Sequence, residues 1–228
     1  MKVHGSADRS TAAPAGGAER RLALVLLIGA LCLFGVTSVV EGPRVVRQVW
    51  SLVGVKQVEE HAGVICAAAA ESGLDPCLLA GLMYAESRGR VDAQSHKEAL
   101  GLFQLRMAAA SDAARRLRLP EPTPEALLSD PLLNARLAAS HLVWLYRHEG
   151  PDLERVLVAY NAGRGTLARW TKDAGGWERW REKHARAGDS ETLTYAQQVI
   201  DFADRFRRRG IVVAGAALAA ADATPDDG

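Results

Sequence analysis

One carboxylate draws attention because of the helix predicted to carry it. The stretch LLAGLMYAESRGR, residues 78–90, is largely apolar and reaches Glu86 shortly before it ends. Glu86 follows Leu82 by four residues and Met83 by three, so a helix places all three on one face. Loss of water there, and the negative end of the helix dipole, both raise the pKa of a carboxyl. Such a carboxyl can carry a proton near neutral pH and transfer it to a leaving oxygen. The competing interpretation is a glutamate at the edge of the apolar stripe that reaches solvent.

Side chains suited to a sugar occur at several later positions. Ser95 and Gln104 supply a hydroxyl and an amide, which hydrogen-bond the hydroxyl and acetamido groups of glycans. Tyr160 and Asn161 lie in the run AYNAG, and Glu191 begins the run ETLTY. Each also has an ordinary structural interpretation. Ser95 could cap a loop, Gln104 could lie on a helix surface, and Tyr160 could pack in the core. Asn161 could belong to a turn, and Glu191 could be a charge at a helix N-terminus.

The order of five short motifs resembles the lytic transglycosylase family, the lysozyme-like domains that cleave peptidoglycan. The resemblance covers roughly residues 60–205, and each motif alone is weak. Five motifs in order, at fitting spacing, make the resemblance specific. They are Glu86-Ser87, Ser95 with Gly101-Leu102-Phe103-Gln104, Asp130-Pro131 with Asn134, Ala159-Tyr160-Asn161-Ala162-Gly163, and Glu191-Thr192 with Tyr195.

The resemblance implies a reaction and a role for each candidate residue. Glu86 is implied as the catalytic acid and then base, without the second carboxylate of other glycosidases. It would protonate the oxygen between N-acetylmuramic acid and N-acetylglucosamine and then deprotonate the muramoyl C6 hydroxyl, which closes a 1,6-anhydro ring. The implied substrate-binding residues are Ser95, Gln104, Phe103, Tyr160, Asn161 and Glu191.

The chain departs from the family pattern at a few positions. Phe103 stands where the family usually has Met, and His141 takes a usual Tyr position. Arg90-Val91 and Arg106-Met107 replace an Asn-Pro and a Met-Pro pair. These departures affect the shape of the groove and the substrate preference more than the chemistry.

The N-terminal part predicts a membrane anchor. Residues 22–40 are nineteen positions without a charge. At about 1.5 Å per residue this helix nearly spans a hydrocarbon core of about 30 Å. The alternatives are a cleaved signal segment, for which the run is long and lacks an A-x-A site, and a buried core helix. Arg20 and Arg21 favour a cytoplasmic tail at 1–21. The expectation is a single-pass protein of the bacterial inner membrane with its catalytic domain in the periplasm.

The remaining chain predicts a mainly α protein with a single helical domain behind the N-terminal transmembrane helix, and the family resemblance implies that this domain is lysozyme-like. A linker at 41–55 leads to the catalytic domain at 56–209, and a C-terminal tail at 210–228 is expected to be poorly ordered. Residues 173–189 are expected to be partly loop, NAGRG is expected to turn the chain, and no stretch shows strand alternation. Helices are expected at 56–72, 75–88, 101–117, 132–148, 152–160, 167–172 and 191–208.

The composition limits which cofactors and partners are expected for this chain. Apolar residues make up 48% and charged residues 24%, the balance of a folded globular protein. The formal net charge of +1 gives no argument for nucleic-acid binding. The six histidines show no HxxxH or HExxH spacing and no CxxC occurs, so neither metal nor cofactor is expected. Cys66 and Cys77 either form a disulfide or serve as two small buried hydrophobes.

Three functions compete. The leading hypothesis is a membrane-anchored lytic transglycosylase, with peptidoglycan glycan strands and the cytoplasmic membrane as partners and cell-envelope machinery as an open possibility. A lysozyme-type hydrolase on the same fold would differ only in its product. A non-catalytic peptidoglycan-binding module is disfavoured by the presence of Glu86 with Ser95, Gln104 and Tyr160.

Overall fold

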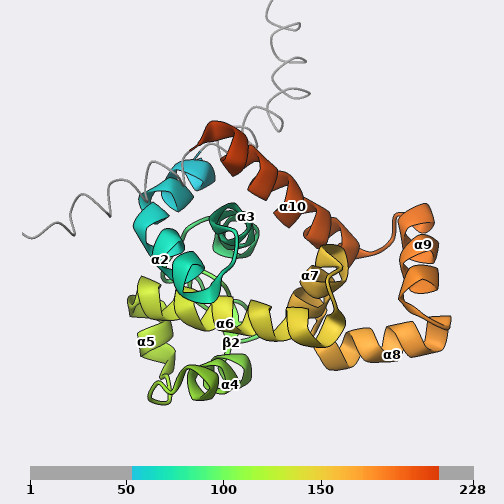
Figure 1. Ribbon diagram of the computed structural model, residues 1–228, viewed down its shortest axis with the longest axis horizontal. Helices are drawn as coiled ribbons and strands as arrows, with labels where there is room; N and C mark the ends of the chain where they lie inside the picture. Colours follow the sequence, from blue (N-terminus) through green and yellow to red (C-terminus); the bar gives the residue numbers. More distant parts are fainter. Residues whose placement is uncertain (1–52, 211–228) are drawn as a thin grey trace, which may run out of the picture. The chain divides into compact units, whose positions relative to one another are not determined.

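Residues 53–210 are described in the computed structural model, and most of them lie in helices (Figure 1). Residues 53–60 are helical and reach the next helix through a turn at His61. The labelled elements are α2 (Ala62–Ser72), α3 (Pro76–Ser87), β1 (Ala99–Leu100), β2 (Leu105–Arg106), α4 (Met107–Leu117), α5 (Pro124–Ser129), α6 (Pro131–Glu149), α7 (Leu153–Ala162), α8 (Arg164–Ala174), α9 (Trp177–Ala187) and α10 (Glu191–Arg209).

Capping side chains set where the helices begin. The Asp75 carboxylate accepts a hydrogen bond from the Cys77 backbone N–H at 2.8 Å, and Pro76 occupies the first helical position of α3. These residues satisfy or remove the backbone donors that a helix N-terminus leaves open. The same kind of cap is made by Asp130 on α6, Asp152 on α7 and Ser190 on α10.

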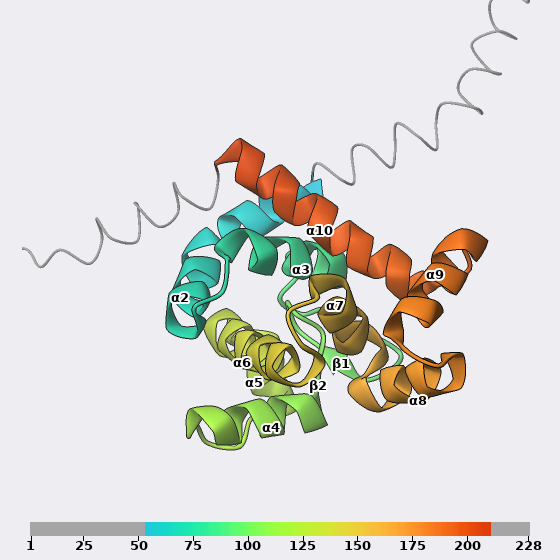
Figure 2. The same cartoon turned by 45° about the vertical axis from the view of Figure 1, so that its right-hand side comes forward.

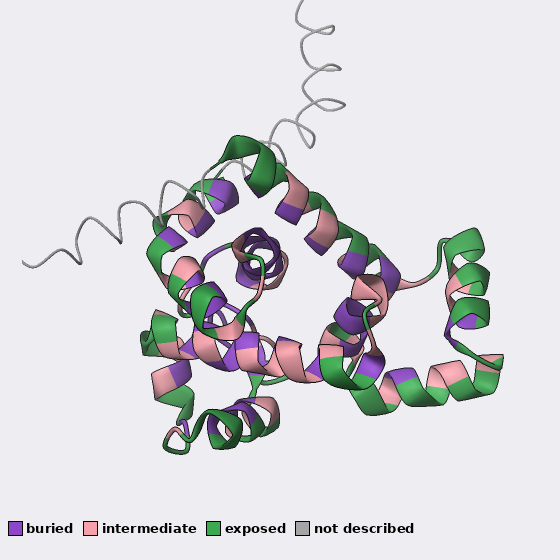
Figure 3. Ribbon diagram, viewed as in Figure 1, coloured by how far each residue is buried: buried purple, intermediate pink, exposed green. Residues whose placement is uncertain are grey.

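Helix α3 lies at the centre of the helical domain. Figure 1 looks along α3 and shows α2, α6, α7 and α10 around it, and Figure 2 shows α10 running alongside it. Residues 77–84 are all buried, so α3 is apolar around its whole circumference (Figure 3). Both α2 and α7 pack against α6, while α10 packs on α3 and α7.

Gly81 allows α10 to approach α3 backbone to backbone. A Cβ at this position would lie 2.4 Å from the carbonyl oxygen of Val199 and 2.7 Å from the backbone nitrogen of Ala203. One helical turn further along, the Tyr84 ring stacks on Phe202 with ring centroids 3.7 Å apart. Together these contacts set both the distance and the register between α3 and α10.

A buried asparagine holds the short antiparallel hairpin that precedes α4. The Asn134 side chain on α6 donates to the carbonyls of Leu100 (3.1 Å) and Leu127 (3.0 Å) and accepts from the Phe103 N–H (3.0 Å). Gly101 has φ 76°, and a Cβ there would lie 2.3 Å from the Asn134 amide nitrogen. The glycine and the asparagine of the sequence motifs therefore shape one turn together.

Several expected boundaries were wrong. The helix expected at 101–117 begins at Met107, because residues 101–106 form the hairpin turn and β2. The stretch 173–189, expected to be partly loop, has short non-helical segments at 175–176 and 188–189, but most of it is helix α9, which the buried Trp177 and Trp180 anchor. In the run NAGRG, residues 161–165, only Gly163 lies outside a helix, and it separates α7 from α8. The proline-rich connector contains α5, which Thr123 caps.

The anchor expected at 22–40, the tail at 1–21, most of the linker at 41–55 and nearly all of the tail at 210–228 lie outside the described residues. Between residues 53 and 210, no helix combines the length and apolar character needed to cross a bilayer. Cys66 and Cys77 are not joined by a disulfide, and Cys77 is buried while Cys66 is half-buried. The second interpretation of the two cysteines therefore fits the structure.

Replacing Gly81 with alanine is expected to reduce the free energy of unfolding by about 1–3 kcal/mol, because the new methyl group meets the backbone of α10. Gly63→Ala is the matched control. It lies in α2 with nothing within 4 Å of its Cβ position, and better helix propensity should add up to about 1 kcal/mol. Urea unfolding monitored by circular dichroism measures the free energy of unfolding of both variants. Equal effects of the two substitutions would contradict the close approach of α3 and α10.

Candidate active site

Glu86 occupies the last turn of the buried helix α3. Arg88, with φ 57°, ends this helix in a left-handed conformation, so Glu86 stands where the chain leaves the core. Burial raises the pKa of the Glu86 carboxyl to about 7, and a hydrogen bond from Tyr195 opposes part of that rise. No neighbouring carboxylate of the described chain contributes to the shift. Glu86 is half-buried, and a pKa of about 7 means that both of its protonation states are populated near neutral pH.

Tyr195 is the residue that the sequence analysis left out of the site. Its hydroxyl donates a hydrogen bond to Oε1 of Glu86 at 2.5 Å, across 109 residues of sequence. Tyr195 stands one turn after Glu191 on α10, at the end of the ETLTY run. That run was the available signal, but only the packing of α10 on α3 shows which residue the phenol meets.

Tyr160, on α7, is the third member of a cluster that also contains Glu86 and Tyr195. Its hydroxyl donates to the backbone carbonyl of Phe103 at 2.9 Å. Burial and then the charge of Glu86 raise the pKa of Tyr160 and the pKa of Tyr195 well above the usual tyrosine value. Both phenols therefore keep their protons at neutral pH, and Glu86 is the member of the trio that titrates there.

Ser95 and Gln104 hold the hairpin next to this cluster. The Ser95 hydroxyl accepts from the backbone N–H groups of Lys97 (3.2 Å) and Ala99 (3.1 Å), which is the loop-capping arrangement. The Gln104 amide donates to the carbonyls of Ala93 (2.9 Å) and Gly101 (3.0 Å). Within residues 53–210, the hydroxyl proton of Ser95 and the amide oxygen of Gln104 have no hydrogen-bond partner, which leaves one donor and one acceptor.

The side chains of three other predicted residues make no hydrogen bond with the Glu86 carboxyl in the described part of the chain. The Phe103 side chain is 0% exposed and packs in the core, so only its backbone carbonyl takes part, through Tyr160. Asn161 is exposed in the last turn of α7, and within residues 53–210 its side chain makes no hydrogen bond that braces the turn. Glu191 is exposed at the first position of α10 and lines a depression of about 230 Å³ that also includes Tyr195.

His141, which takes a usual Tyr position, packs beside Tyr160 with ring centroids 5.5 Å apart. Its Nδ1 atom is buried without a hydrogen-bond partner in the described part of the chain. Burial, and then the positive charge of Arg116, lower the pKa of His141 to about 4. The imidazole is therefore uncharged at neutral pH and adds no charge beside Glu86.

The described residues include no group of three or more His, Cys, Asp or Glu side chains able to hold a metal ion. The cluster contains one carboxyl with a pKa near neutrality and two protonated phenols, beside a hairpin with unused polar atoms. This arrangement suits the donation and recovery of one proton at an oxygen atom.

Comparison with known proteins assigns the family. The family model of the transglycosylase SLT domain matches residues 63–182, and the chain belongs to this family. The matched region contains Glu86, Ser95, Gln104 and Tyr160 and ends before Tyr195.

Individual relatives agree with this assignment. Membrane-bound lytic murein transglycosylase C from Salmonella paratyphi B and from Salmonella typhimurium is 33% identical over 122 residues, which are 50% of this chain and 34% of each relative. The chain thus matches about a third of the length of these proteins. An inactive mutant of the lytic transglycosylase Slt from Pseudomonas aeruginosa is similar in structure, with 26% identity and a TM-score of 0.57 over 65% of this chain and 24% of that one. The 70 kDa soluble lytic transglycosylase from Escherichia coli, at 23% identity and a TM-score of 0.55, shares the fold over 64% of this chain and 24% of its own.

Glu86→Gln is expected to stabilise the protein above neutral pH. The carboxyl has a pKa of about 7 in the folded chain against an ordinary value of 4.5, so the folded state binds more protons between these values. The free energy of unfolding of the wild type therefore falls as pH rises from 4.5 to about 7 and stays low above it. The variant lacks this fall and gains on the order of 3 kcal/mol at about pH 8.

Urea unfolding of both proteins near pH 4.5 and about pH 8 measures this difference. Glu125→Gln, at an exposed carboxylate on α5, is the control and should show no such dependence. If Glu86→Gln changed stability equally at both pH values, the raised pKa of Glu86 would be wrong.

Proposed function

We propose that this chain is a membrane-anchored peptidoglycan lytic transglycosylase that uses Glu86 as its acid and base. The observation that carries the proposal is the half-buried Glu86 carboxyl, with a pKa of about 7 and a hydrogen bond from Tyr195. Such a group is partly protonated at neutral pH and gives up its proton readily. The substrate bond is the β-1,4 linkage between N-acetylmuramic acid and N-acetylglucosamine.

In the first step Glu86 donates its proton to the glycosidic oxygen, and the bond from that oxygen to C1 of the muramoyl residue breaks. The acetamido group of the substrate stabilises the cationic centre at C1. In the second step the ionised Glu86 takes the proton of the C6 hydroxyl as that oxygen bonds to C1. A 1,6-anhydro end forms, no water is consumed, and Glu86 returns to its protonated state.

Tyr195 directs this chemistry by occupying one carboxyl oxygen. Its bond to Oε1 leaves the other oxygen of Glu86 for the proton exchanged with the substrate. Tyr160 is tied to the Phe103 carbonyl and so holds the hairpin against the cluster. Ser95 and Gln104 would meet the glycan with their unused donor and acceptor, while Asn161 and Glu191 would contact it from exposed positions.

Anchoring at residues 22–40 would place the catalytic domain in the periplasm, where peptidoglycan lies. The charge-free run in the sequence supports this, and so does the similarity to relatives named membrane-bound lytic murein transglycosylase C. A glutamate-to-glutamine change is the mutation in the inactive Pseudomonas aeruginosa Slt protein. That agrees with an essential glutamate in the present chain.

The activity test incubates the full chain, purified in detergent, with purified peptidoglycan and analyses the released muropeptides by mass spectrometry. Products lighter than hydrolytic ones by one water are expected, because the C6 hydroxyl replaces water as the attacking group. Glu86→Gln should release at least about a thousandfold less product, and Glu125→Gln should match the wild type. Full-mass reducing ends would instead establish a lysozyme-type hydrolase. Intact polymer that retains the folded protein would favour the non-catalytic module.

Tyr195→Phe should change the pH dependence of the activity. The Tyr195 hydrogen bond lowers the pKa of Glu86, so its removal raises that pKa above about 7. Because the first step needs protonated Glu86, the rate falls as pH rises through its pKa, and this fall should move to higher pH in the variant. Initial rates across the pH range measure the shift. A fall that stayed in place or moved to lower pH would exclude Tyr195 as a partner that favours ionised Glu86.

A further inference from the structure

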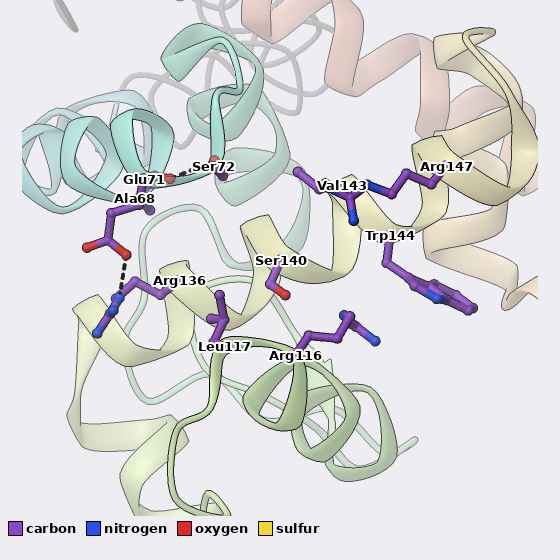
Figure 4. A pocket seen from close by; sticks show the side chains of 10 residues that line it. All are labelled: Ala68, Glu71, Ser72, Arg116, Leu117, Arg136, Ser140, Val143, Trp144 and Arg147. Atoms are coloured by element: carbon purple, nitrogen blue, oxygen red, sulfur yellow. Dashed lines mark hydrogen bonds and ion pairs between the residues drawn. The ribbon is translucent and has the colours of Figure 1, made fainter.

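A hollow of about 230 Å³ opens between α2, α4 and α6 and includes none of the residues assigned to the Glu86 site. Figure 4 shows its lining, with Arg116 extending from α4 toward Ser140 and Trp144, while the Arg147 side chain runs along α6 to Val143. We call this hollow the arginine pocket. Neither the sequence motifs nor the proposed reaction accounts for it.

The arginine pocket carries an excess of positive charge. Of its three arginines, Arg136 is paired with Glu71, the one acidic residue of the lining, at 2.6 Å. Arg116 and Arg147 form no ion pair with a carboxylate of the described residues. The acidic group near Arg116 is Asp112, and that carboxylate is bonded to Arg115 on the outer side of α4. Two guanidinium groups therefore face the hollow without a counter-charge of their own.

Arg116 and Arg147 are both exposed, and Arg116 also lies against an aromatic ring. The Arg116 guanidinium carbon lies 5.5 Å from the centre of the Trp144 ring, a distance at which the ring attracts a cation. Burial, with Arg115 as a lesser cause, lowers the pKa of Arg116 from its ordinary value, although the group stays charged at neutral pH. An anion in the pocket would pair with this guanidinium. The Ser140 hydroxyl, unpartnered in the described part of the chain, adds a hydrogen-bond donor beside it.

These groups select a carboxylate over a sugar. Guanidinium groups bind carboxylates with two parallel hydrogen bonds, whereas an uncharged glycan offers no charge to satisfy them. Pockets for drug-sized ligands measure about 300–1,000 Å³, so this smaller hollow suits a group the size of an amino acid. In peptidoglycan the free carboxylates belong to the short peptides attached to the glycan strands.

We propose that the arginine pocket binds a free carboxylate of a peptidoglycan peptide stem, on a face separate from the Glu86 carboxyl. The proposal rests on the proposed function, which supplies peptidoglycan as the partner. The pocket backs onto the catalytic cluster through three neighbouring rings, because His141 lies 5.7 Å from Trp144 and 5.5 Å from Tyr160. The enzyme thereby holds the peptide part of its substrate while the glycan part lies at Glu86.

The test uses the full-length Glu86→Gln protein and isothermal titration calorimetry with a soluble stem tetrapeptide. A counterpart with every carboxylate converted to a carboxamide is the second probe, and inorganic phosphate is the third. The free-acid peptide should bind at least about tenfold more tightly than the other two. Arg116→Gln with Arg147→Gln should weaken peptide binding at least about tenfold, while Arg169→Gln with Lys183→Gln removes the same charge elsewhere and should not.

Ser140→Asp provides an independent variant, because it places a carboxylate in the pocket and should abolish peptide binding without removing an arginine. Melting curves verify that each variant is folded. Equal binding of the carboxamide, phosphate as tight as the peptide, or full binding by the double arginine variant would each overturn the proposal. The outcomes are separable from the activity test, because a protein that forms anhydro products without binding the peptide loses only this inference. A protein that binds the peptide through both arginines but forms no such products loses only the proposed reaction.

Discussion

The structure depends on the close approach of α3 and α10. Gly81 has no side chain, so the backbone of α10 at Val199 and Ala203 rests directly on α3. This contact has two consequences for the neighbouring turn. It helps to bury the end of α3, where burial raises the pKa of the half-buried Glu86, and it brings the Tyr195 hydroxyl to Oε1 of the same residue. A packing contact between backbones thus sets both the proton affinity and the orientation of one carboxyl.

Burial and the Tyr195 hydrogen bond have opposite effects on the pKa of Glu86. Burial alone disfavours the ionised carboxylate, while a phenol that donates a hydrogen bond favours it. The result is a pKa near neutrality, where both protonation states are populated and a single group can serve as acid and then as base. The phenols of Tyr160 and Tyr195 do not compete for this role, because burial and the charge of Glu86 raise the pKa of each. The raised pKa predicts a loss of stability above neutral pH, because the ionised form of Glu86 is disfavoured in the folded chain.

Local signals in the sequence predicted the helices more accurately than they predicted the contacts between helices. Asp75 and Pro76 placed the start of α3, and the apolar spacing before Glu86 indicated that this carboxyl would lose water. The partner of Glu86 was not predictable, because Tyr195 meets it only when two helices 109 residues apart pack together. Phe103 was expected to contact substrate, yet its side chain is in the core, since Asn134 draws its backbone inward. Helix α9 was missed because its charged composition concealed the burial of Trp177 and Trp180.

The most direct measurement is the titration of the Glu86 carboxyl itself by NMR. Protein labelled with carbon-13 at the glutamate side-chain carboxyls is followed across the pH range, and the Glu86→Gln variant identifies the resonance that belongs to Glu86. A midpoint near 7 in the wild type would confirm that burial beneath α10 keeps this carboxyl partly protonated at neutral pH. A midpoint near the ordinary value of 4.5 would contradict the account, since Glu86 would then be ionised throughout the physiological range and unable to act as the acid.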